Sequence, residues 1–194
     1  MARSIRLMQG EKWIATDVVN ELRLPLFVKP SAGGSSFGVT KVKELSELTV
    51  AIEKAFEESQ EALVEEFIDG NEFTCGVVRI GRKKIVFPVT EVIPRNEFFD
   101  FEAKYTPGMA EEITPARISA NLTQEVQDLS AEIYELCNCK GIVRVDYILK
   151  DGIFYFLEIN TVPGMTATSF IPQQIKAAGL SLTDLLTEII LGEV

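Results

Sequence analysis

Four polar side chains interrupt two otherwise apolar segments between residues 141 and 166. The first segment carries Arg144 and Asp146, and the second carries Glu158 and Asn160. Burying a charge without a partner is costly, so such residues are unusual in apolar strands. Strand side chains alternate between two faces, so the members of each pair share a face.

Whether the two faces coincide depends on the connection, a Lys-Asp-Gly segment that predicts a β-hairpin. A two-residue turn would put Asp146 opposite Leu157 and leave Glu158 on the wrong face. A three-residue loop, with its glycine in the left-handed conformation, places Arg144 opposite Glu158 and Asp146 diagonal to it. We expect the three-residue loop, because it alone gathers the polar set.

Carboxylate and amide oxygens are hard ligands that suit Mg²⁺, an ion that prefers octahedral oxygen coordination. Asp146, Glu158 and Asn160 are therefore the candidate ligands for Mg²⁺ or Mn²⁺. The alternative is a structural ion pair of Arg144 with Asp146 or Glu158. Four convergent polar groups, followed by Asn-Thr-Val-Pro-Gly-Met-Thr, favour a site.

The composition excludes several classes of catalytic site and partner. The chain of 194 residues contains no histidine, which excludes Ser-His-Asp and Cys-His catalysis and zinc sites built on histidine. A net charge of −10 and a pI near 4.6 argue against nucleic acid and acidic membranes as partners. Local cations and metal must therefore meet any anionic substrate.

The sequence also indicates a compartment. No apolar run approaches the ~20 residues needed to span a bilayer, and the N-terminus lacks a signal-peptide pattern. The cysteines, Cys75, Cys137 and Cys139, form no disulfide framework and suggest reduced thiols. We expect a cytoplasmic protein.

A glycine-rich loop, residues 31–38, lies between two predicted strands in residues 25–42. Its glycines permit positive φ and close approach of the backbone, which leaves N–H groups free for phosphate oxygens. It is not a P-loop, because Gly-Lys-Ser/Thr and a following helix are absent. The alternative is a flexible hairpin without a ligand.

Further elements would hold these segments in place. Strands are predicted over residues 62–68, 72–79 and 86–93. Helices are predicted where apolar residues recur at intervals of three and four: Leu48, Ile52, Ala55 and Phe56; Leu122, Val126, Leu129, Ile133 and Leu136; and Leu182, Leu185, Leu186, Ile189 and Ile190.

The segment from Arg144 to Met165 resembles the metal-binding hairpin of ATP-grasp enzymes, specifically the D-alanine–D-alanine ligase family. The resemblance covers nearly the whole chain from Leu24 onward, with the motifs in the family's order. It implies an α+β ATP-grasp fold, in which two α/β lobes with mostly antiparallel sheets enclose the nucleotide site. Residues 1–68 would form the central lobe, truncated at its start, and residues 69–194 the C-terminal lobe.

The resemblance also implies a nucleotide site. Glu102-Ala103-Lys104-Tyr105 is similar to a loop that closes over the active site in this family, and the absence of histidine there favours the peptide-forming branch. The implied ATP-binding residues are Lys29 and Lys104 at the phosphates, Ser36 in the glycine-rich loop, Glu65 with the backbone of Phe67 and Ile68 at adenine, and Glu72 at the ribose.

The resemblance also implies catalytic and substrate-binding groups. Arg144 and the Gly164 N–H would form an oxyanion hole, and Ser169 would hold the carboxylate of the second substrate. Tyr105 would hydrogen-bond toward Ser35 and latch two loops together. The implied reaction joins two D-alanines through an acyl phosphate, with ATP and Mg²⁺, for peptidoglycan precursors.

If the resemblance holds, this chain lacks the N-terminal domain of such ligases, and the first-substrate site lies outside it. We then expect weak nucleotide binding and little or no turnover by the chain alone. A homodimer is the oligomeric state that the resemblance allows. The alternatives are another ATP-grasp carboxylate–amine ligase and a nucleotide-binding module that is inactive in isolation.

Overall fold

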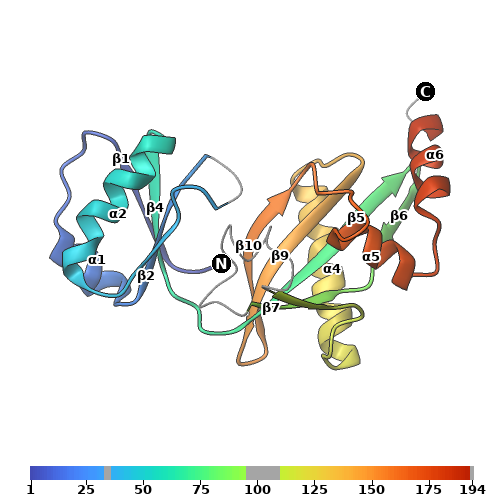
Figure 1. Ribbon diagram of the computed structural model, residues 1–194, viewed down its shortest axis with the longest axis horizontal. Helices are drawn as coiled ribbons and strands as arrows, with labels where there is room; N and C mark the ends of the chain where they lie inside the picture. The colour runs from blue at the N-terminus through green and yellow to red at the C-terminus, as the bar shows by residue number, and fades with distance from the viewer. Residues whose placement is uncertain (33–35, 95–109, 193–194) are drawn as a thin grey trace. The chain divides into compact units, whose positions relative to one another are not determined.

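The computed structural model describes residues 1–32, 36–94 and 110–192 (Figure 1). The described residues form two compact units, residues 1–69 and residues 70–94 with 110–192. The assignment of residues 1–68 and 69–194 to two ATP-grasp lobes stays a prediction. None of the described helices is long and apolar enough to cross a membrane.

The first unit is a four-stranded antiparallel sheet with two helices packed on one face. Leu26 and Val28 are fully buried in this core, so the alternating Phe27 and Lys29 point to the opposite face. In sheet order the strands are β1 (Ser4–Met8), β4 (Glu61–Glu66), β2 (Leu26–Pro30) and β3 (Thr40–Val42), and the helices are α1 (Ala15–Leu22) and α2 (Leu45–Glu58).

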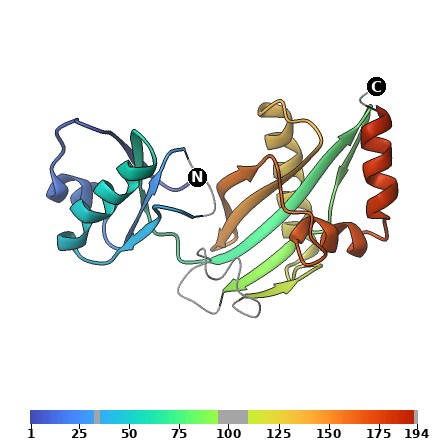
Figure 2. The same ribbon diagram turned by 45° about the horizontal axis from the view of Figure 1, so that its top comes forward.

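The second unit is a six-stranded sheet in which every recorded strand pair is antiparallel (Figure 2). Its main order is β10 (Ile153–Asn160), β9 (Ile142–Lys150), β5 (Asn71–Ile80), β7 (Thr90–Pro94) and β8 (Ala110–Ile113), and β6 (Lys83–Val86) also pairs with β5. The helices of this unit are α4 (Ala120–Leu136), α5 (Phe170–Ala177) and α6 (Leu182–Gly192).

Helices cover both faces of this second sheet. Val126 and Tyr134 of α4 pack against Phe73, Val145 and Tyr147 on one face. On the other face α5 and α6 contribute a second apolar cluster, which contains Val78, Phe87, Ile142, Ile171, Ile175 and Leu185. The helix stripes predicted from the sequence are present, although Leu136 and Ile190 at the helix ends are exposed.

A buried glutamine fastens α5 to β5. The Gln174 side chain is fully buried, and its Oε1 accepts from the Gly76 N–H at 2.9 Å. Its Nε2 donates to the Thr74 carbonyl and to Thr90 Oγ1, both at 3.0 Å. A Cβ on Gly76 would lie 2.5 Å from Ile171 Cδ1 and 2.7 Å from Gln174 Oε1, so only glycine lets α5 approach this closely.

Gly76→Ala is expected to lower the free energy of unfolding by about 1–3 kcal/mol, because the methyl group overpacks this contact. Urea denaturation followed by circular dichroism measures the loss. Gly192→Ala is the matched control, since its added Cβ would meet nothing closer than 3.6 Å. Equal stability of the two variants would contradict the packing argument.

Candidate active site

The β9–β10 hairpin brings the polar set together by a route that the sequence did not indicate. Ile153 pairs with Lys150, so the loop is a two-residue turn, Asp151-Gly152, with φ values of 51° and 78°. The expected three-residue loop is therefore wrong. A β-bulge between Phe156 and Glu158 adds one residue to β10 and shifts the register instead.

Past the bulge, Glu158 pairs with Asp146 and Asn160 pairs with Arg144. All four side chains therefore share one face of the sheet, as predicted, although their roles stay predictions. Leu157 is the inserted residue. A two-residue turn without this bulge would have placed Leu157, not Glu158, opposite Asp146.

Asp146 is the centre of this cluster and accepts four hydrogen bonds. On Oδ1 it accepts from Thr74 Oγ1 at 2.6 Å and Arg144 Nε at 2.8 Å. On Oδ2 it accepts from Arg144 Nη2 at 2.8 Å and Asn160 Nδ2 at 2.9 Å. An ionised carboxylate offers about four lone-pair sites, so this network saturates it.

Arg144 is held from two sides. Its guanidinium forms the bidentate pair with Asp146 and lies 5.1 Å from the centre of the Phe170 ring. Burial lowers the pKa of Arg144, but the hydrogen bonds and charge of Asp146, with Glu158 and Glu112, outweigh it and raise the pKa overall. The side chain therefore remains a cation, and three of its five N–H donors can still serve another oxygen.

The donor chemistry of the cluster fits a hard divalent ion after one local change. The Asn160 Nδ2 amide lies between the two carboxylates, 2.9 Å from Asp146 Oδ2 and 3.4 Å from Glu158 Oε1. Turning that amide over would present Oδ1 beside the carboxylates and free a lone pair on Asp146. Asp146, Glu158 and Asn160 are the side chains that would hold such an ion. Across the described residues no three Asp, Glu, Cys or His side chains gather to hold a metal.

The segment after Asn160 folds back through Gly164 to the start of α5. Ser169 Oγ accepts from the Thr166 N–H at 3.1 Å and lies 2.8 Å from Thr166 Oγ1. A Cβ on Gly164 would lie 2.9 Å from the same Ser169 Oγ, which is too close. The two residues predicted to meet the substrate, Gly164 and Ser169, are therefore neighbours in space.

Three predicted nucleotide residues of the first unit, Lys29, Glu65 and Phe67, lie on the sheet face that carries no helix. Lys29 Nζ and Glu65 Oε2 form an ion pair at 2.8 Å. The Phe67 ring lies 5.9 Å from that of Phe27, and Lys41 Nζ stands 3.9 Å above it. This arrangement offers an aromatic surface beside a lysine and a carboxylate.

The structure describes few contacts for the remaining predicted site residues. Ile68 is almost fully buried, and Ser36 has a positive φ of 60°. Glu72 is half-buried on β5, on the same face as Thr74. Ser35, Lys104 and Tyr105, predicted for the lid and the closing loop, lie outside the described residues.

Sequence patterns gave no signal for Lys41, Thr74, Glu112 or Phe170, because their contacts depend on strand register and on where α5 lies. The cysteines take no part in the cluster, and burial raises the pKa of Cys75 to about 12, so this thiol is unreactive near neutral pH.

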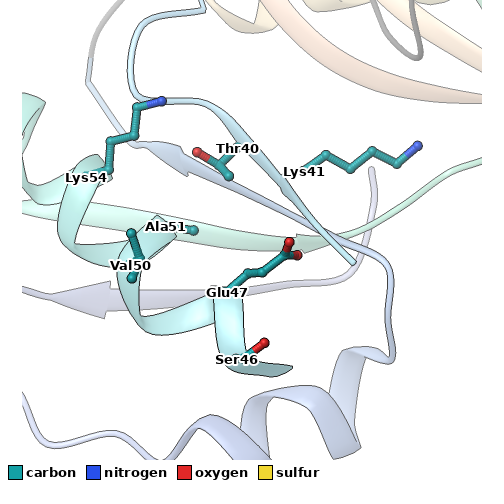
Figure 3. Close-up of a pocket in the computed structure, with 7 residues that line it drawn as sticks. All are labelled: Thr40, Lys41, Ser46, Glu47, Val50, Ala51 and Lys54. Atoms are coloured by element: carbon teal, nitrogen blue, oxygen red, sulfur yellow. The ribbon is translucent and has the colours of Figure 1, made fainter. Parts of the chain in front are cut away.

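A hollow of about 460 Å³ on α2 and β3 contains none of the predicted site residues (Figure 3). In Figure 3 the amino groups of its two lysines, Lys41 and Lys54, lie well apart. Glu47 in its wall accepts from the backbone N–H groups of Lys43 and Glu44, which caps α2. We therefore assign the hollow no role in the site.

A family model described as D-ala D-ala ligase C-terminus matches residues 2–191. The chain belongs to this family. It is 56% identical to proteins named D-alanine–D-alanine ligase from Azobacteroides pseudotrichonymphae, over 97% of the chain, and Parabacteroides distasonis, over 100%. The aligned regions span only 59% and 58% of those ligases, so the chain corresponds to about three fifths of its relatives' length.

Solved structures of the ligase family share the fold. VanG D-Ala:D-Ser ligase from Enterococcus faecalis is 37% identical with a TM-score of 0.85, covering 100% of this chain and 57% of that one. D-alanine–D-alanine ligase from Bacillus anthracis complexed with ATP is 32% identical with a TM-score of 0.80, covering 98% and 59%. The predicted ATP-grasp fold with mostly antiparallel sheets is confirmed.

Thr74→Val is expected to lower the free energy of unfolding by about 1–3 kcal/mol, because Asp146 loses a donor in a half-buried network. Thr74→Ser keeps the hydroxyl and should retain most of the stability. A double-mutant cycle with Asp146→Ala, measured by urea denaturation, isolates the pair. Strictly additive losses would show that the 2.6 Å contact contributes nothing.

Proposed function

We propose that this chain is the ATP- and metal-binding part of an enzyme that joins two D-alanines into D-alanyl-D-alanine, for peptidoglycan synthesis and cell shape. The observation that carries the proposal is the convergence of Arg144, Asp146, Glu158 and Asn160 on one sheet face. The ligase names of relatives 56% identical over almost the whole chain support it.

The reaction would proceed without a nucleophilic side chain. The carboxylate of the first D-alanine attacks the γ-phosphate of ATP and forms an acyl phosphate with release of ADP. The amine of the second D-alanine then attacks the carbonyl carbon, and phosphate leaves. Catalysis by positioning and charge stabilisation suits a chain that contains no histidine.

Arg144 and the backbone N–H of Gly164 would stabilise the oxyanion of the second step. Two donors of Arg144 hold Asp146, and the remaining ones can reach a substrate oxygen. One preorganised donor of this kind contributes about 2.7–4 kcal/mol. Ser169, beside Gly164, would bind the carboxylate of the second D-alanine.

The proposed nucleotide contacts are those that the family resemblance implies. Lys29 and Ser36 would contact the phosphates. Adenine would be bound by Glu65 and by the backbone of Phe67 and Ile68. Glu72 would contact the ribose. Ser35, Lys104 and Tyr105 remain proposed for the loops over the site. Mg²⁺ or Mn²⁺ held by Asp146, Glu158 and Asn160 would neutralise charge on the phosphate oxygens.

We infer a cytoplasmic location, where ATP is available and free cysteines stay reduced.

Glu158→Ala is expected to abolish Mg²⁺-dependent binding of a nonhydrolysable ATP analogue and to leave the circular dichroism spectrum unchanged, because it removes one of two ligand carboxylates. Isothermal titration calorimetry on this chain measures the affinity with and without Mg²⁺. Glu132→Ala, an exposed glutamate of α4, is the matched control. Unaltered Mg²⁺-dependent affinity in Glu158→Ala would remove the metal assignment.

The activity itself can be tested in a chimera in which residues 1–194 replace the corresponding part of the Parabacteroides distasonis ligase. We expect D-alanine-dependent phosphate release and dipeptide formation by the chimera, and little or none by the chain alone. Screening other amino acids, D-serine included, separates this ligase from other carboxylate–amine ligases. Nucleotide binding without any ligation by the chimera would support a binding module instead.

A further inference from the structure

Glu112 is a carboxylate near the cluster that the proposed mechanism leaves without a role. It lies on β8, where it pairs with Val92 of β7. Its Oε2 accepts from Gln173 Nε2 of α5 at 2.5 Å, and the charge of Arg144 acts to lower its pKa. Glu112 is half-buried, whereas the adjacent Glu111 is exposed.

Among the described residues, Glu112 has no cation as a hydrogen-bond partner. Arg144 directs its bidentate hydrogen bonds to Asp146 and not to Glu112. Glu112 is left with a neutral amide as its direct partner. Burial raises the pKa of Glu112, and the Gln173 hydrogen bond and the Arg144 charge offset that effect only in part. A second cation beside Glu112 would stabilise its ionised form.

The same glutamine links Glu112 to the segment proposed for the acceptor. Gln173 Nε2 also donates to the Thr168 carbonyl at 2.8 Å. Thr168 directly precedes Ser169, which lies against Gly164. Glu112 is therefore bound to the same glutamine that holds the loop proposed for the second D-alanine. The adjacent Glu111 points to the opposite face of β8 and is exposed.

We propose that the Glu112 carboxylate binds the ammonium group of the acceptor amino acid, an inference that rests on the proposed function. An amino acid carries that cation at neutral pH and binds in this form. It must then lose one proton to solvent before its amine can attack the carbonyl carbon held by Arg144 and Gly164. Ser169 would bind the acceptor's carboxylate, and Glu112 supplies the negative charge that the acceptor's other end requires. A hydroxy acid offers no such cation.

A purely structural role would make Glu112 a tether for α5. Glu112→Gln separates the two roles, because a glutamine oxygen can still accept from Gln173 while the charge is lost. Gln173→Leu does the reverse, since it removes the tether and keeps the charge. Glu111→Gln removes the same charge from the neighbouring exposed residue and is the matched control.

The experiment measures kcat/KM in the chimera for D-alanine and for D-lactate as acceptors, together with KM for ATP. For Glu112→Gln we expect kcat/KM with D-alanine to fall by about 10- to 100-fold, the effect of losing a hydrogen bond to a charged group. KM for ATP should not change, and any activity with D-lactate should be retained. Glu111→Gln should match the unsubstituted chimera in all three.

Unchanged D-alanine kinetics in Glu112→Gln would overturn the proposal, as would an equal loss with D-lactate. A loss in Gln173→Leu that equals or exceeds the loss in Glu112→Gln would show that Glu112 is only a tether. These failures leave the proposed function intact, because the unsubstituted chimera is active. An inactive unsubstituted chimera would instead refute the proposed function, and the Glu112 proposal with it.

Discussion

The saturation of one carboxylate is the constraint on which the second unit depends. Asp146 accepts hydrogen bonds from β5 through Thr74, from its own strand through Arg144, and from β10 through Asn160. Each donor reaches Asp146 only if strands β5, β9 and β10 keep their register. The hydrogen bonds of the polar cluster and the packing of the apolar face therefore require the same strand register. A shift of one residue would disrupt both.

One face of this sheet carries the apolar core, and the other carries both apolar residues and the polar cluster. The face under α4 is apolar and includes Phe73, Val145 and Tyr147. The other face is apolar where Ile171, Ile175 and Leu185 pack on it. It is polar near the start of α5, where Arg144 lies beside the Phe170 ring. Gln174 joins these regions, because it fixes α5 to β5 and so sets where Phe170 and Ser169 lie.

Much of this arrangement can be read from the sequence, because alternation assigns residues to strand faces and helical spacing marks the buried stripes. The shared face of Arg144, Asp146, Glu158 and Asn160 follows from such patterns. The bulge at Leu157 does not, since a bulge without glycine leaves no mark in residue types. Thr74 lies 72 residues before Asp146, so no local pattern could indicate that contact. Glu112 depends in addition on the position of α5.

The bulge also makes the length of the turn independent of which side chains of β10 share a face with Asp146. In a regular hairpin the length of the turn decides which side chains of the returning strand face the partner's polar residues. Here the pairing register changes at Leu157, several residues beyond the Asp151-Gly152 turn. Changes that lengthen both arms equally at the tip would preserve the arrangement at Asp146. Insertion or deletion of a single residue between Leu157 and Asn160 would not, so this short stretch should resist length variation during evolution.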